Sequence, residues 1–198
     1  MSRSDLSRSD LSRSGPATGG DPFHGLPGHP MMWILIGSEL LVFGLALVAF
    51  SGARLLDPAG FATAQNHLDR LSGLMNMFVL LTSGLFAALA VDGAQAGNTR
   101  CVRRNLALAG LLGCVFLAFK MREYAQDLAA GHDIGSGTFF TLYYLITGFH
   151  ALHVVLGLVI LAIVARFPDQ GNVETAAAFW HMVDLVWLLV FPVIYLIR

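Results

Sequence analysis

The sequence predicts an all-α integral membrane protein, built as a bundle of five transmembrane helices. Hydrophobic residues make up 56% of the 198-residue chain and charged residues only 13%, whereas an average soluble domain has about 25% charged residues. The mean hydropathy is +0.66. Five apolar runs approach or exceed the roughly 20 residues that cross a bilayer core. Because backbone groups in lipid need internal partners, each run is expected to be a helix.

The charge balance and the cysteines exclude several function classes. The formal net charge is -1, which argues against a nucleic-acid partner because such proteins present a basic face. Cys101 and Cys114 fall on one predicted helix, so a rise of 1.5 Å per residue separates them by about 20 Å. That separation rules out a disulfide between them. No cysteine spacing typical of a zinc site occurs.

The chain divides into a tail and a membrane domain. Residues 1–30 begin with repeats of Ser-Arg-Ser-Asp-Leu and continue with Gly and Pro, so we expect a disordered, low-complexity tail and linker. This segment lacks the apolar core of a signal peptide. Residues 31–198 form the predicted five-helix domain.

The five expected spans contain few ionisable residues. They cover about residues 31–53, 71–91, 102–119, 138–164 and 175–197, with the third helix continuing to about residue 130. The segments 57–60 and 167–169 contain Pro and indicate turns, and Pro192 predicts a mild kink in the last span. The cluster Arg100, Arg103 and Arg104, together with the tail arginines, predicts a cytoplasmic N-terminus and a periplasmic C-terminus.

Glu39 lies within the first span. A carboxylate at that depth costs several kcal/mol if it has no partner. It is therefore either a neutral group with hydrogen bonds inside the bundle or a carboxyl that handles protons or faces lipid headgroups.

Two histidine-containing patterns mark the fourth and fifth spans. His150 and His153 are three residues apart and share a helix face, and His181 and Asp184 repeat that spacing. These residues could form a hydrogen-bonded network between helices, or a pair of metal ligands completed from another span. An Asp beside a His also fixes the imidazole tautomer, and it is half of a proton relay.

Other polar groups are expected near the helix ends. Trp180 and Tyr195 are interpreted as anchors at the two membrane interfaces. Lys120 is expected to extend its amine to the membrane surface, and Glu123 and Tyr124 to lie at a solvated helix end.

Taken together, these motifs resemble subunit III of the haem-copper oxidases over about residues 30–198. The resemblance rests on Ser38-Glu39, Asn76 with residues 80–84, Glu123-Tyr124, and residues 138–140, 148–154 with Gly157, and 179–187, which end in Trp187. The chain lacks the two helices that precede Ser38-Glu39 in the seven-helix form, so one wall of the lipid-filled cleft is missing. The run before the histidines is similar to the five-helix accessory protein associated with nitric oxide reductase.

The resemblance implies a non-catalytic subunit in a bacterial inner membrane, with no haem and no metal of its own. Its implied partners are the catalytic haem-copper subunit and bound phospholipid, and its implied role is to support assembly and proton uptake. Glu39, Glu123, His150, His153, His181 and Asp184 would then form an internal polar network, with Glu39 on the helix that faces the catalytic subunit.

Two rival functions are compatible with the same residues. One is a membrane cytochrome that holds haem between His150 or His153 and His181. The other is a small proton-coupled transporter, although such proteins are usually built from inverted repeats and broken helices.

Overall fold

The structure is a computed structural model that describes residues 30–197, so the predicted disorder of the tail lies outside the described residues. The helices are α1 Pro30–Leu56, α2 Pro58–Gln65, α3 Arg70–Gln95, α4 Thr99–Ala129, α5 Thr138–Arg166 and α6 Gln170–Phe191, followed by the π-helical turn η1 Pro192–Leu196. All except α2 and η1 are long and apolar enough to cross a membrane. The predicted all-α class and the five spans are confirmed.

Several boundaries differ by a few residues from the sequence-based expectation, and two of the differences change the local structure. The segment 57–60 does not make a simple turn but starts α2, with Pro58 in the first helical turn and the Asp57 carboxylate accepting from Gly60 N at 3.0 Å. This is the usual chemistry of a helix start. The fifth span begins at Gln170 rather than near residue 175. Its first turn is polar and precedes the apolar run, but it belongs to the same helix.

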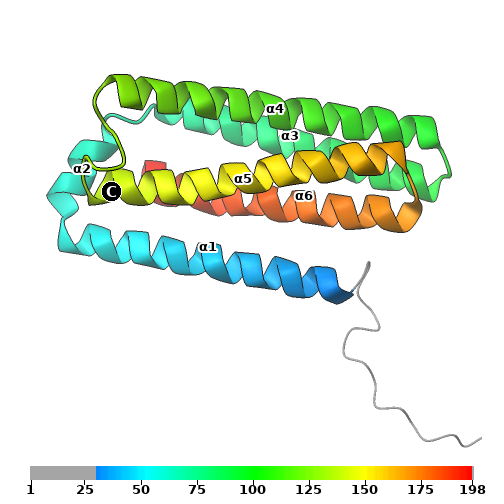
Figure 1. The fold of residues 1–198 in the computed structure, drawn as a ribbon, viewed down its shortest axis with the longest axis horizontal. Helices are drawn as coiled ribbons and strands as arrows, with labels where there is room; N and C mark the ends of the chain where they lie inside the picture. The colour runs from blue at the N-terminus through cyan, green and yellow to red at the C-terminus, as the bar shows by residue number, and fades with distance from the viewer. Residues whose placement is uncertain (1–29, 198) are drawn as a thin grey trace, which may run out of the picture.

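The helices are not equally embedded in the bundle. Figure 1 shows α3, α4, α5 and α6 packed together and α1 running along the edge, where it contacts α5 and α6. Met32, Phe43 and Phe50 are the described apolar side chains of α1 that are buried, whereas Leu41, Leu45 and Val48 are exposed. α1 therefore presents most of its apolar surface outward.

The middle of α6 forms the core of the bundle. Trp180 and Trp187 are fully buried, and two glycines make room for Trp180. A Cβ on Gly113 or Gly157 would come within 2.7 Å of the indole ring. Small residues at these positions let α4 and α5 approach α6 closely, as is usual between membrane helices.

Side chains from other helices hold the turn that follows α6. Pro192 cannot donate a backbone hydrogen bond, and the expected kink takes the form of the turn η1. Arg54 Nη2 donates to the carbonyl of Val193 at 2.7 Å, and Gln65 Nε2 donates to those of Ile194 and Ile197 at 2.7 and 3.0 Å. Side chains from α1 and α2 thus bind the carbonyl groups of this turn.

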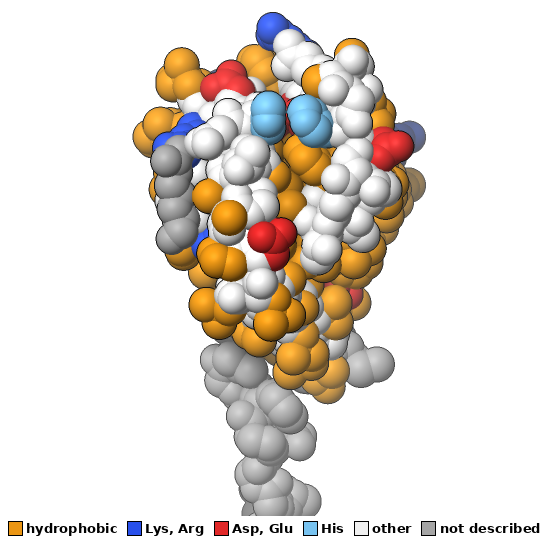
Figure 2. Space-filling view, turned by 90° about the vertical axis from the view of Figure 1, so that its left-hand side faces the viewer, with side chains coloured by type: hydrophobic (Ala, Val, Ile, Leu, Met, Phe, Trp, Pro, Cys, Tyr) orange, Lys and Arg blue, Asp and Glu red, His pale blue; other side chains and the backbone are white. Residues whose placement is uncertain are grey.

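The end of the bundle that carries α2 is more polar than its flanks. Figure 2, which faces this end, shows acidic side chains and two neighbouring histidines among polar atoms, with apolar side chains around them. His67 and His132, from the connections before α3 and after α4, have ring centroids 4.6 Å apart. Polar ends and apolar flanks are the distribution that a bilayer requires.

Candidate functional site: the buried polar groups of the bundle

A buried ion pair lies in the half of the bundle near α2. Lys120 is 0% exposed and Glu123 6%, and Lys120 Nζ lies 3.2 Å from Glu123 Oε2. The ammonium also donates to the hydroxyls of Tyr143 and Tyr195 at 2.9 and 2.8 Å. Both hydroxyls in turn donate to Glu123 Oε1, at 2.8 and 2.5 Å. We call these four residues the Lys120 cluster.

Aromatic rings surround the ammonium of Lys120. Its Nζ lies 4.6 to 5.5 Å from the centroids of Tyr124, Tyr143, Trp187 and Tyr195. Ring faces attract a cation most strongly where water is excluded. The cluster therefore satisfies a buried charge through one carboxylate, two hydroxyls and four rings, and it joins α4, α5 and η1.

Three expectations about helix ends are wrong. Lys120 does not extend to the membrane surface, because its hydrogen bonds lie inside the bundle. Glu123 is not at a solvated end for the same reason. Tyr195 is 1% exposed and contributes to the Lys120 cluster instead of anchoring an interface.

Trp180 also lies deeper than expected. Trp180 is 0% exposed and donates from Nε1 to Ser83 Oγ at 3.0 Å, and Ser83 donates to the Ala109 carbonyl at 2.7 Å. Trp180 is thus a link between α6, α3 and α4, and its prediction as an interface anchor is wrong. Trp187 is buried beside His150.

Tyr124, also expected at a solvated helix end, and Asn76, one of the residues that carry the family resemblance, form contacts between helices instead. Asn76 is buried and its Nδ2 lies 3.4 Å from the Phe116 carbonyl. The Tyr124 hydroxyl and Thr147 Oγ1 lie 2.6 Å apart, which joins α4 to α5.

Glu39 finds its partner on α5. Its Oε2 lies 3.1 Å from His153 Nε2, and His153 Nδ1 lies 2.9 Å from the Phe149 carbonyl. Because that carbonyl only accepts, Nδ1 carries a proton. Oε2 makes no hydrogen bond with the described residues, so its approach to Nε2 is a close polar contact. This contact brings α1 and α5 together.

His150 turns away from this pair. It is 0% exposed, its ring stacks on Trp187 with centroids 5.1 Å apart, and it meets Phe116 edge-on at 5.6 Å. Neither ring nitrogen has a hydrogen-bond partner among the described residues. His150 and His153 thus both touch the Phe43 ring, but only His153 approaches Glu39.

His181 and Asp184 lie on another side of α6, against α3. His181 Nδ1 and Asp184 Oδ2 are 3.8 Å apart, and the His181 side chain is 48% exposed while that of Asp184 is 7% exposed. A Cβ on Gly84 would collide with the Asp184 carboxylate. The structure thus separates the predicted network into the pair Glu39–His153, the isolated His150 and the pair His181–Asp184.

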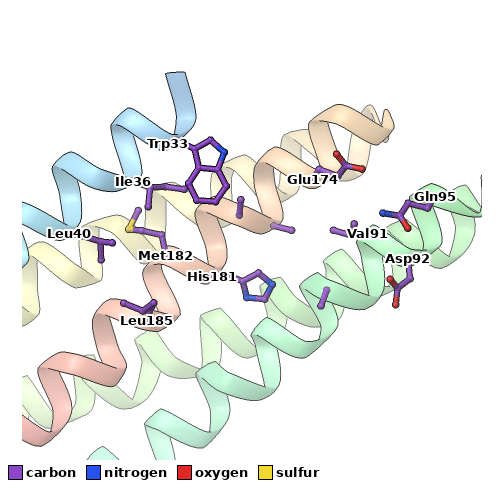
Figure 3. Close-up of a pocket in the computed structure, with 13 residues that line it drawn as sticks. Trp33, Ile36, Leu40, Val91, Asp92, Gln95, Glu174, His181, Met182 and Leu185 are labelled. Carbon is purple, nitrogen blue, oxygen red and sulfur yellow. The ribbon is translucent and has the colours of Figure 1, made fainter. Parts of the chain in front are cut away.

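A cleft opens beside His181. It has a volume of about 660 Å³ and lies between α1, α3 and α6. Figure 3 shows Trp33, Ile36 and Leu40 along one wall, His181 projecting between α6 and α3, and Asp92, Gln95 and Glu174 toward the far end.

The described residues offer little to a metal ion. Among residues 30–197 there is no group of three or more His, Cys, Asp and Glu side chains that could hold one. Cys101 and Cys114 are free thiols, as their spacing predicts.

The comparisons with known proteins identify the family. A model of the family described as cytochrome c oxidase subunit III matches residues 31–197. The chain belongs to this family. A haem-copper oxidase subunit I+III of Aeropyrum pernix is 32% identical, over 84% of this chain and 22% of that protein. A cytochrome c oxidase subunit 3 of Prototheca wickerhamii is 36% identical, over 61% of this chain and 48% of its own length.

A third relative matches at nearly full length. A probable cytochrome c oxidase subunit 3 of Mycobacterium bovis is 28% identical, over 83% of this chain and 85% of that protein. By contrast, the chain spans about a fifth and about half of the Aeropyrum and Prototheca proteins. The sequence-based resemblance to subunit III is confirmed.

The Lys120 cluster as a whole was not predicted from the sequence. A pattern for it does exist, because Lys120, Glu123 and Asp127 occur at helical spacing on one face of a segment that continues past the apolar run. In the structure Asp127 is also buried, and its Oδ2 lies 3.5 Å from the Tyr143 hydroxyl. Three charged residues that share one helix face next to a span indicate a buried contact as well as a solvated end.

Proposed function

We propose that this chain is a non-catalytic, multi-pass subunit of a haem-copper oxidase complex in a bacterial inner membrane, where it packs against the catalytic subunit. The family match over residues 31–197 carries the proposal. The Aeropyrum relative adds support, because its name joins subunit I and subunit III in one protein.

The polar groups of the bundle support a structural role. The Lys120 cluster is satisfied by groups of this chain. His150 and His181 lie on different sides of α6, one against Trp187 and the other against Gly84. That separation argues against a haem held between them.

We propose that proton support runs through Glu39 and His153. A carboxyl and an imidazole whose Oε2 and Nε2 lie 3.1 Å apart can pass a proton between them. The Glu39 side chain is about a quarter exposed, so it can meet a neighbour in the complex, although its Oε2 is buried.

Phospholipid has a suitable groove on the other side of the bundle. The space between α3 and α4 measures about 590 Å³ and has an apolar wall that includes Met75, Phe78 and Val79. Its polar lining includes Arg122 and the carboxylates of Asp69 and Glu123. An apolar wall with a guanidinium suits an acyl chain and a lipid phosphate.

We propose a cytoplasmic N-terminus, in line with the arginines in the first turns of α4.

The relatives above carry oxidase names, so an oxygen-reducing complex is the first candidate. The association with nitric oxide reductase stays a prediction from the sequence resemblance. Copurification decides between them: the tagged chain, extracted from native membranes in mild detergent, is expected to bring along a larger haem-containing subunit whose terminal acceptor is assayed directly.

An absorption spectrum of the chain alone provides the control. If the purified chain itself carries stoichiometric haem and no larger subunit accompanies it, the membrane cytochrome hypothesis holds and the accessory role is refuted.

A further inference from the structure

Buried polar atoms without hydrogen-bond partners gather at one place inside the bundle. Nine such side-chain atoms occur among residues 30–197, and four of them belong to only three side chains. They are both ring nitrogens of His150, Nε1 of Trp187 and Oδ1 of Asn76. These side chains come from α5, α6 and α3 and are at most 1% exposed, so bulk water does not reach them.

The three side chains meet around Phe116 of α4. The Phe116 ring contacts those of His150 and Trp187, with centroids 5.6 and 4.9 Å away. Its backbone carbonyl lies 3.4 Å from Asn76 Nδ2, and the rings of His150 and Trp187 stack on each other. All four packed helices of the bundle therefore contribute to this place. We call Asn76, Phe116, His150 and Trp187 together the His150 site.

The unpartnered atoms of the His150 site form a balanced set of donors and acceptors. The indole N–H of Trp187 only donates, and the side-chain oxygen of Asn76 only accepts. An imidazolium buried without an acceptor would be costly, so the His150 ring is neutral and adds one donor and one acceptor. None of the two donors and two acceptors bonds to another described residue. Each would cost free energy if it stayed unpaired in the interior of the bundle.

Water is the ligand that complements this set. Buried water molecules typically make about three hydrogen bonds to groups that otherwise lack partners, both as donors and as acceptors. A cation is disfavoured, because two of the atoms are N–H donors and the ammonium of Lys120 lies 5.3 Å from the centroid of the Trp187 ring. An anion would leave the Asn76 oxygen unpaired. An acyl chain forms no hydrogen bond, and the enclosed side chains leave it no way in.

We infer that the His150 site binds internal water. Trp187 Nε1 and one ring nitrogen of His150 donate to this water, and Asn76 Oδ1 and the other ring nitrogen accept from it. The inference concerns this chain alone and goes beyond the proposed function. Because the Trp187 ring also packs against the ammonium of Lys120, the bound water places exchangeable protons beside the Lys120 cluster, in the interior of the bundle.

NMR of the full-length chain in mild detergent, with isotope-labelled tryptophan, tests the inference. The chain has three tryptophans, and loss of one signal in Trp187→Phe assigns that residue. The indole proton of Trp187 is expected to show a nuclear Overhauser cross-peak with water. Trp180 is the internal control and is expected to show none, because it is equally buried and its Nε1 donates to Ser83 Oγ.

A substitution in the His150 site shows whether the cross-peak reports bound water. Asn76→Leu removes one acceptor and fills its place with an apolar side chain, so the cross-peak of Trp187 with water is expected to disappear. Thr82→Val is the matched control on the same helix, since Thr82 is exposed and its hydroxyl bonds to the Phe78 carbonyl of its own helix. It is expected to leave the cross-peak unchanged. An indole proton that exchanged only through the N–H of His150 would keep its cross-peak in Asn76→Leu.

High-resolution density of the unsubstituted protein gives a second measurement, which stands even if Asn76→Leu does not fold. A density peak is expected at hydrogen-bond distance, roughly 2.7–3.2 Å, from Trp187 Nε1 or Asn76 Oδ1. No peak there, in a map that shows ordered water at the ends of the bundle, would overturn the inference. A Trp187 signal without a cross-peak to water, or a cross-peak that persists in Asn76→Leu, would overturn it as well.

Discussion

Removing the amine of Lys120 should destabilise the bundle more than any other single loss of charge in α4. Lys120→Met keeps the volume of the side chain but leaves the Glu123 carboxylate, 6% exposed, without its cation. Breaking a buried ion pair in this way costs about 3–5 kcal/mol. In a chain of this length each 1 kcal/mol lowers Tm by about 2–4 °C, so the expected shift is roughly 6–20 °C.

Thermal unfolding of the purified chain in mild detergent measures this shift. Arg100→Met is the matched control, since Arg100 is exposed on the same helix, and its effect should stay within about 0.5 kcal/mol. The double variant Lys120→Met/Glu123→Met removes both charges and is expected to recover at least half of the loss. A Tm for Lys120→Met equal to that of the unsubstituted chain would refute the buried pair, and a double variant no better than the single one would show that packing, not charge, is responsible.

Further substitutions test the helix contacts and the proton-bearing pair. Gly157→Ala should cost about 1–3 kcal/mol of stability through overpacking, because its Cβ would meet Trp180 at 2.7 Å. Gly44→Ala, whose Cβ would have no atom within 4 Å, should be neutral or stabilising. Equal Tm values for the two variants would contradict the close approach of α5 to α6. Glu39→Gln should preserve copurified haem and the initial oxygen-uptake rate, because an amide can still donate to His153 Nε2. Immediate and complete loss of uptake would mean that Glu39 is essential for turnover.

The positions of the membrane helices could be predicted from the sequence because hydropathy and backbone hydrogen bonding leave few choices in lipid. The short helix α2 was not predicted, since Asp57, Pro58 and Gly60 suit a turn as well as a helix start. Whether a helix grows from such a start depends on tertiary contacts such as those of Phe61, which packs on Phe50 and Phe139.

The polar residues were harder to place than the helices. Spacing alone puts His150 and His153 on one face, but a face about 100° wide can contact two neighbours, here α6 and α1. Lys120 was expected to reach the surface because a long amine next to an apolar run usually does. Burial of the Lys120 amine is favourable because Tyr143 and Tyr195, which are distant in the sequence, accept hydrogen bonds from it in the folded bundle. No local sequence pattern reveals these two partners.

The carbonyl groups of η1 that Arg54 and Gln65 bind have a consequence for biogenesis. α1 is the first described membrane helix to leave the ribosome, and η1 is made after all the membrane helices. Because α1 buries little of its own surface, we expect it to attach fully to the bundle only after η1 has been synthesised. A chain arrested after α5 would hold α1 only through contacts such as Glu39 with His153, and it would be an early substrate for membrane proteases.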